Sequence, residues 1–281
     1  MTALPCHVRR IAGIDFTSRP TRRKPVTVAL GRVDRGVATL ERIESHHAFE
    51  TFSAWLRTQG PWVGAFDFPF GLPRELVEAL DWPSEWRALM AHYASLPRAE
   101  IRTTFAAFCA ARPAGGKFAH RACDAPAGSS SPMKWVNPPV AYMLHAGVAL
   151  LLDAGVHLPH LHAGDIDRVA LEGYPGLLAR ELIGRRSYKS DTKVKHTAER
   201  AAARRDLVDA LEGGRSRLGI RLDIDAPQRH ALIADGSADT LDAVLCMVQA
   251  AWAADRPNHG LPADTDSLEG WIVTTPVVSR P

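Results

Sequence analysis

The sequence has few features of an exported, membrane-spanning or zinc-binding protein. Only four of its 281 residues are cysteines, none of them in a Cys-x-x-Cys pair, and no Cys/His set has zinc-finger spacing. The first residues, MTALPCHVRR, lack the apolar segment of a signal peptide. The longest apolar stretch, residues 139–152, is too short and too interrupted to cross a bilayer. We therefore expect a reduced, cytoplasmic protein with no membrane partner.

The sequence also lacks a strong excess of one charge, an internal repeat and a low-complexity tract. Its 34 basic and 31 acidic residues leave a net charge of +3, which does not by itself indicate nucleic-acid binding. The hydrophobic share of 46% and the charged share of 23% are ordinary for a globular protein. We expect one folded domain over residues 1–281, in an oligomeric state that the sequence leaves open.

Apolar periodicity predicts an α/β order of elements. A turn at residues 34–36 joins two alternating segments and indicates a hairpin. The first five elements read β-β-β-α-β, since one helical pattern separates three early strands from a fourth. The expected strands cover residues 8–15, 26–33, 37–43, 62–67, 165–172 and 269–278. The expected helices outside the middle region cover residues 48–57, 195–212 and 238–255, and a further helix begins near Pro175.

The middle region, residues 74–160, differs from this pattern and predicts a mostly helical insertion or lid. Helix-like segments lie at 84–96, 102–111 and 138–153, and residues 123–139 are expected to form a loop. The region contains Trp82, Trp86 and Trp135. These tryptophans could stack on bases, but packing in the core of the insertion is the favoured interpretation. The segment HLPHLH at 157–162 could bind a transition metal, although a proline-bearing surface loop is the favoured interpretation.

Three predicted strands end in an acid: Asp15 after IAGI, Asp67 after GAF and Glu172 after VAL. In an open sheet, sites form just beyond strand ends. Asp239 and Asp242 are spaced i, i+3, so both carboxylates share one face of an otherwise apolar helix. Because that helix must pack on the sheet, we expect the five carboxylates to converge.

Converging carboxylates repel one another, and a divalent metal relieves that repulsion. Oxygen ligands suit Mg²⁺ or Mn²⁺, and two ions about 3.5–4 Å apart can activate water and stabilise the leaving oxygen of a phosphodiester. Simpler interpretations exist for single residues. Asp15 could cap the next turn, Asp67 could be a turn acid, and Asp239 could favour the start of a helix. Asp242 is harder to explain this way, because it lies inside the apolar pattern.

Several segments together resemble a known family: GIDFTS, AFDFPFGLP, LEGYPG, SYK and DTLDAVLC. They resemble family 429 of the domains of unknown function, which is described as predicted nucleases with a ribonuclease H-like fold. The resemblance runs in patches from about residue 11 to 275. It implies a mixed β-sheet with flanking helices, carrying the helical region 74–160 as an insertion. It also implies a two-metal site, with ligands Asp15, Asp67, Glu172, Asp239 and Asp242.

A basic run follows the strand that ends at Glu172. Its members are Arg180, Arg185, Arg186, Lys189, Lys193, Lys195, Arg200, Arg204 and Arg205. Four acids dilute the run, so a solvated face is one interpretation. The other is contact with phosphates, for which Arg185, Arg186, Lys189 and Lys193 are the candidates. Lys189 could in addition balance the acids or touch a scissile phosphate.

The sequence and the resemblance favour a metal-dependent nuclease that hydrolyses phosphodiester bonds of DNA or RNA. Two Mg²⁺ or Mn²⁺ ions would be the cofactors, and the catalytic residues would be Asp15, Asp67, Glu172, Asp242 and Lys189. An ATP-dependent phosphotransferase of the actin and hexokinase type is an alternative. It is disfavoured because no glycine lies between Asp15 and Gly31, where a phosphate hairpin would need one. A non-catalytic metal-binding member of the fold is a second alternative, in which arginines could neutralise the acids.

Overall fold

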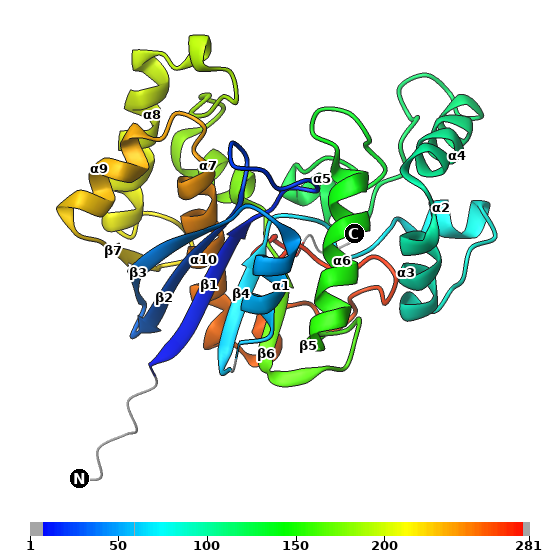
Figure 1. The fold of residues 1–281 in the computed structure, drawn as a ribbon, viewed down its shortest axis with the longest axis horizontal. Coiled ribbons are helices and arrows are strands. Elements are labelled where there is room, and N and C mark those ends of the chain that lie inside the picture. The colour runs from blue at the N-terminus through cyan, green and yellow to red at the C-terminus, as the bar shows by residue number, and fades with distance from the viewer. Residues whose placement is uncertain (1–7, 59, 278–281) are drawn as a thin grey trace.

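A seven-stranded mixed sheet forms the centre of the computed structural model, which describes residues 8–58 and 60–277 (Figure 1). The strand order is β5-β6-β4-β1-β2-β3-β7. The strands are β1 (Arg9–Asp15), β2 (Val26–Asp34), β3 (Val37–His46), β4 (Trp62–Phe66), β5 (Val156–His157), β6 (Asp165–Glu172) and β7 (Arg221–Asp223). β1, β2 and β3 pair antiparallel, whereas the other neighbours pair parallel. The predicted α/β class is confirmed, and the order is compatible with a ribonuclease H-like core.

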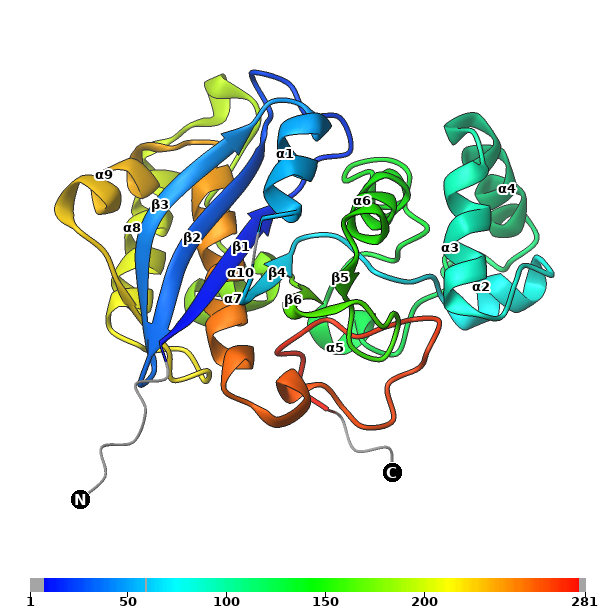
Figure 2. The same cartoon turned by 60° about the horizontal axis from the view of Figure 1, so that its bottom comes forward.

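Helices cover both faces of the sheet (Figure 2). Strand alternation sends Ile11 and Ala29 into one core and Ala12 and Ile14 into the other. The first core includes α7 (Pro175–Ile183), α8 (Ala198–Glu212) and α10 (Asp239–Ala254), with α9 (Ala226–Ala234) beside them. The second includes α1 (Phe49–Leu56) and α6 (Val140–Ala154). The sheet therefore lies between two hydrophobic layers.

Helix α10 lies directly on β1, and Gly13 permits this approach. A Cβ atom at Gly13 would lie 2.0 Å from the carbonyl oxygen of Ala243 and 2.1 Å from the backbone nitrogen of Met247. No other residue fits that space without moving the helix. The contact fixes the first turn of α10 next to the end of β1.

The middle region is helical, as predicted. It contains α2 (Arg74–Ala79), α3 (Trp86–Ser95), α4 (Arg98–Ala110), α5 (Asp124–Ala127) and α6. The expected loop at 123–139 contains the short helix α5, which its small residues and proline did not reveal. Trp86 is buried, and Trp82 and Trp135 pack against the same core, so their role in packing is confirmed.

Other differences concern short elements. The expected strand over 269–278 is wrong: Ile272 forms only an isolated bridge to Glu172, and Val278 lies outside the described residues. The segment turns at 273–274, where Thr274 has a φ of 68°. The 3-10 turns η1 (Lys193–Lys195) and η2 (Pro257–Gly260) were not expected, nor were α2, α9, β5 and β7.

The histidine segment at 157–162 forms a surface connection. His160 lies 2.7 Å from the side-chain nitrogen of Asn258, and the ring of His162 stacks on Trp86. Three cysteines are buried and free, namely Cys109, Cys123 and Cys246, and Cys6 lies outside the described residues. In the part of the chain that the structure describes, no helix has the length and apolarity needed to cross a membrane.

Candidate functional site

A cleft of about 900 Å³ opens at the carboxyl ends of β1, β4 and β6. Its walls come from these strand ends, from α7 and the segment after it, and from residues 129–143 of the middle region. Among its lining residues are Asp15, Asp67, Glu172 and Lys189. The expectation that strand-end acids meet at one edge of the sheet therefore holds for these three acids.

Asp15 and Asp67 are neighbours across two parallel strands. Ile14 is in register with Phe66, and the backbone N–H of Asp67 donates to the carbonyl of Ile14 at 2.9 Å. The next pair in this register is Asp15 and Asp67, whose backbones are separated by the usual strand spacing of about 4.8 Å. The two carboxyl groups therefore face the same part of the cleft.

Neither carboxyl group forms an ion pair within the part of the chain that the structure describes. Oδ2 of Asp15 is buried and accepts no hydrogen bond from any described residue. Burial raises the pKa of Asp15 well above its usual value, and Asp242 and Asp239 raise it further. Burial also raises the pKa of Asp67 to about 7, although the charge of Lys189 opposes the change. Two adjacent carboxyl groups thus have a high proton affinity, because burial outweighs the opposing charges of Lys24 and Lys189.

The first turn of α10 supplies two further acids, Asp239 and Asp242, each of which holds a lysine. Nζ of Lys24 lies 2.7 Å from Oδ1 of Asp239. Lys189 forms an ion pair with Asp242, and the hydroxyl of Tyr188 donates to the same carboxylate at 2.6 Å. Although burial disfavours its charged form, Asp15 and Asp239 raise the pKa of Lys24. Both lysines therefore stay charged at neutral pH.

Glu172 lies at the same edge but belongs to a different network. Arg121 donates to its two carboxylate oxygens at 2.6 and 2.7 Å, and to Asp124 at 2.9 Å. The backbone N–H of Phe70 donates to Glu172 at 2.9 Å. All three charged groups are buried, and burial raises the pKa of Glu172 although Arg121 opposes it. This network fastens the segment before α5 to the end of β6.

The register of β6 explains this separation. Glu172 is in register with Phe66, one residue before Asp67. Because successive side chains on a strand point to opposite faces, Glu172 projects from the face opposite to that of Asp67. Gly173 occupies the position level with Asp67, and a Cβ there would lie 3.1 Å from Sγ of Cys246 in α10.

Sequence reasoning missed four charged or polar partners in this site: Lys24, Arg121, Asp124 and Tyr188. Lys24 has a local signal, because it precedes β2 and so returns to the strand end where Asp15 lies. Arg121 and Asp124 come from a segment without periodicity, and Arg121 meets Glu172 across 51 residues of sequence. Tyr188 is part of the SYK segment, in which only the lysine carries a charge that indicates a function.

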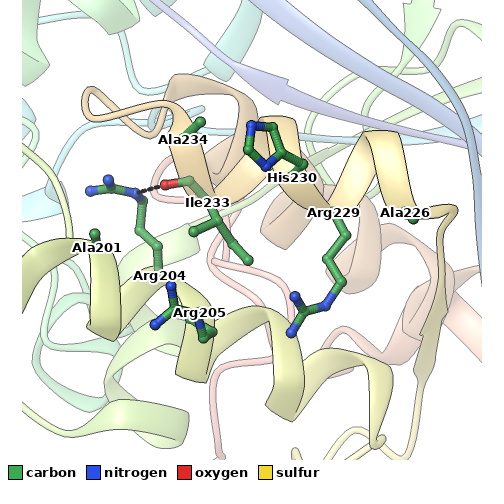
Figure 3. Close-up of a pocket in the computed structure, with 8 residues that line it drawn as sticks. All are labelled: Ala201, Arg204, Arg205, Ala226, Arg229, His230, Ile233 and Ala234. Atoms are coloured by element: carbon green, nitrogen blue, oxygen red, sulfur yellow. Dashed lines mark hydrogen bonds between the residues drawn. The ribbon is translucent and has the colours of Figure 1, made fainter.

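Arg204 holds the backbone of Tyr188 in place. Its buried guanidinium donates through Nε to the carbonyl of Ile233 and through Nη1 to the carbonyl of Tyr188, both at 2.8 Å. No carboxylate pairs with it within residues 8–58 and 60–277. Figure 3 shows Arg204 and its bond to Ile233 at a separate groove of about 460 Å³ between α8 and α9. Arg204 thus ties the start of the 188–189 segment to α9.

The predicted phosphate-contacting residues lie in two places. Arg185, Arg186 and Lys189 line the cleft, and Lys193 is exposed in η1 beyond Asp191. Arg186 pairs with Asp206 at 2.7 Å, and both side chains are about half exposed. Such an exposed pair contributes little stability and leaves the guanidinium free to exchange partners.

A family model described as "Protein of unknown function (DUF429)" matches residues 13–266. The chain belongs to the DUF429 family. No curated protein and no solved structure matches it. The DUF429 match spans all of the acids and lysines of the cleft, and it confirms the family resemblance of the sequence segments. The description of the DUF429 family names no activity.

The donor chemistry of the DUF429 cleft fits a divalent cation at Asp15 and Asp67. The buried Oδ2 of Asp15 is a free oxygen ligand, and the pKa of both carboxyl groups is raised by uncompensated burial. In the described residues, no three His, Cys, Asp or Glu side chains already form a group that could hold a metal. Lys24 pairs with Asp239 and Lys189 pairs with Asp242. Each of these acids would have to release its lysine before it could bind an ion.

Proposed function

We propose that this cleft is the active site of a metal-dependent nuclease that hydrolyses phosphodiester bonds of nucleic acids. The observation that carries the proposal is the buried, unpartnered oxygen of Asp15 beside Asp67, in a cleft whose rim is basic. Leaving a buried carboxylate unpaired costs several kcal/mol, and a bound cation would offset that cost. Basic side chains at the rim suit a polyanionic substrate.

Asp15 and Asp67 are the residues that would hold Mg²⁺ or Mn²⁺, with Asp242 and Asp239 as ligands once their lysines move. A bound ion would supply positive charge that polarises a phosphodiester and activates water. The free carboxylate oxygens support one ion directly. A second ion would require Lys24 to leave Asp239 or Lys189 to leave Asp242.

Protonation of Asp67 gives the site a second property. With a pKa raised to about 7 by burial, its carboxyl group keeps a proton well above the usual range of an aspartic acid in the metal-free protein. A bound ion would displace this proton, because a carboxylate binds a metal in its deprotonated form. Lys189 lines the same cleft, and its charge would bind a phosphate oxygen beside Asp67.

Glu172 is better placed to position the cleft than to bind metal. Its two oxygens accept three hydrogen bonds, from Arg121 and Phe70. Taking Glu172 as a metal ligand would leave the buried Arg121 with Asp124 as its remaining carboxylate partner. We assign Glu172 the role of fastening the middle region to the sheet.

The test is cleavage of labelled single-stranded, double-stranded and branched DNA and RNA in Mg²⁺, Mn²⁺ or EDTA. The variant is Asp15→Asn. The matched control is Asp34→Asn, because Asp34 ends β2 at the opposite end of the strands from Asp15. The wild-type protein and Asp34→Asn should cleave at least one substrate with metal, whereas Asp15→Asn should not. Absence of metal-dependent cleavage for every substrate would refute the proposal.

Three ion pairs favour a second candidate, a non-catalytic metal-binding member of the fold. Arg121 neutralises Glu172, Lys24 neutralises Asp239 and Lys189 neutralises Asp242. This candidate predicts metal binding that depends on Asp15 without cleavage of any nucleic acid. ATP hydrolysis measured in the same reactions would separate a phosphotransferase from both.

A further inference from the structure

The loop between β1 and β2 is strongly basic. Residues 16–25, FTSRPTRRKP, contain Arg19, Arg22, Arg23 and Lys24 and no acid. Lys24 turns into the site, where it meets Asp239. Arg19, Arg22 and Arg23 are exposed, and their side chains form no ion pair or hydrogen bond with any residue that the structure describes. Three free guanidinium groups therefore stand on one short loop.

This loop is held in place at several points. A nitrogen of the Arg98 guanidinium, in α4, donates to the carbonyl of Ser18 at 2.7 Å. The backbone N–H of Thr21 donates to the carbonyl of Lys24 at 2.9 Å, which closes a turn around Arg22 and Arg23. The two arginines are thus presented on an anchored turn, and little backbone order would have to be gained on binding.

The β1–β2 loop also contacts the basic segment that follows α7, which contains Arg185, Lys193 and Lys195. Nζ of Lys24 lies 2.9 Å from Oδ1 of Asp191. Arg23 is next to Lys24 and Lys193 is two residues from Asp191, so at 3.8 Å per residue their Cα atoms lie within about 4 Å and about 8 Å of the Cα atoms of the two paired residues. Figures 1 and 2 show the β1–β2 loop at the end of the sheet beside the chain that follows α7.

We infer that the two segments form one surface that binds the phosphate backbone of a nucleic-acid strand and leads it into the cleft. The surface comprises Arg19, Arg22, Arg23, Arg185, Lys193 and Lys195, and we call it the two-loop surface. This inference rests on the proposed function, which supplies the reason for nucleic acid as the partner. The two-loop surface continues into the cleft through Arg185 and Lys189, so a strand bound there would have phosphates both on the surface and beside Asp15.

Arginine is well suited to this role. Its planar guanidinium donates two parallel hydrogen bonds to a phosphate, and it stays charged at all accessible pH values. Contacts with phosphates position a strand without reading its bases. The two-loop surface should therefore bind strands of different sequence with similar affinity and with a strong dependence on salt.

The test measures binding of a labelled single-stranded DNA 20-mer in EDTA over a series of NaCl concentrations. The variant is Arg22→Gln/Arg23→Gln. The control is Arg10→Gln/Arg35→Gln, which removes the same charge at the opposite end of the sheet, where both arginines are exposed and unpaired among the described residues. Two lost phosphate contacts should reduce the slope of log K against log salt by about 1.4, which is roughly a 25-fold loss of affinity at 0.1 M salt. The control should retain the wild-type slope.

Several results would overturn the inference. These are absence of wild-type binding, an unchanged slope in Arg22→Gln/Arg23→Gln, or an equal loss in the control. Competition by polyglutamate as strong as that by unlabelled DNA of equal charge would indicate an acidic protein as the partner instead. Because binding is measured in EDTA, the outcome is independent of cleavage. DNA binding as expected without cleavage would reject the nuclease activity and support the two-loop surface. Cleavage with an unchanged salt slope in Arg22→Gln/Arg23→Gln would support the nuclease activity and reject the two-loop surface.

Discussion

Asp67 should make the stability of the fold depend on pH, and Asp67→Asn measures that dependence. In the folded protein the pKa of Asp67 is about 7, compared with an ordinary value of 3.8. Between these two values the folded state keeps a proton that the unfolded state has lost. The free energy of unfolding must therefore fall as pH rises from about 4 to about 7, since stability falls wherever the folded state binds more protons.

The size of the effect follows from the shift. One pKa unit corresponds to about 1.4 kcal/mol, so a shift of about three units corresponds to roughly 4 kcal/mol if realised in full. The side chain of Asp67 is partly exposed, and solvent screening reduces this to about 2–4 kcal/mol. Asparagine cannot ionise. Between pH 4 and pH 8 the free energy of unfolding of Asp67→Asn should therefore rise relative to that of the wild-type protein by this amount.

Urea unfolding followed by tryptophan fluorescence, in EDTA at pH 4, 6 and 8, gives the required free energies. Asp264→Asn is the control, since Asp264 is exposed and lies outside the cleft lining. The difference in free energy of unfolding between Asp264→Asn and the wild-type protein should stay constant with pH. If the difference for Asp67→Asn is equally constant, Asp67 is not an uncompensated carboxyl group and the electrostatic reasoning for the site fails.

Three further substitutions test how the cleft is held together, each by urea unfolding. Gly13→Ala should cost about 1–3 kcal/mol or more, because the added methyl group overlaps the carbonyl oxygen of Ala243; an unchanged stability would show that α10 does not depend on this contact. Glu172→Gln should cost about 3–5 kcal/mol by removing a buried partner of Arg121, and a neutral effect would contradict the buried network. Arg204→Met should cost about 1–3 kcal/mol by leaving carbonyl groups unpaired, whereas unchanged stability would remove Arg204 from the support of the site.

The parts of the site that sequence predicted are those fixed by local spacing. Asp15 follows an apolar strand directly, and β-strand periodicity placed its end correctly. The i, i+3 spacing of Asp239 and Asp242 on an apolar helix predicted that both acids would face the sheet, and both are buried in the first turn of α10. Helical spacing likewise placed α1, α4 and α6 to within a few residues.

The parts that sequence could not predict depend on register and on distant partners. Glu172 and Asp67 both follow apolar strands, yet a shift of one residue between β4 and β6 sends Glu172 to the other face. Nothing in either strand sequence reveals that shift. The lysine that pairs with Asp239 is Lys24, which lies 215 residues away in the sequence. Tertiary packing alone determines such pairs.

The central claim is that Asp15 and Asp67 together bind a divalent cation. The most direct measurement is calorimetric titration of Mn²⁺ and Mg²⁺ at pH 6.5, repeated in buffers of different ionisation enthalpy to count released protons. The wild-type protein and Asp34→Asn should bind metal and release more than half a proton, because the ion displaces the proton that Asp67 holds below its pKa of about 7. Asp15→Asn should lose binding. Failure of the wild-type protein to bind metal, or equal binding by Asp15→Asn, would contradict the account.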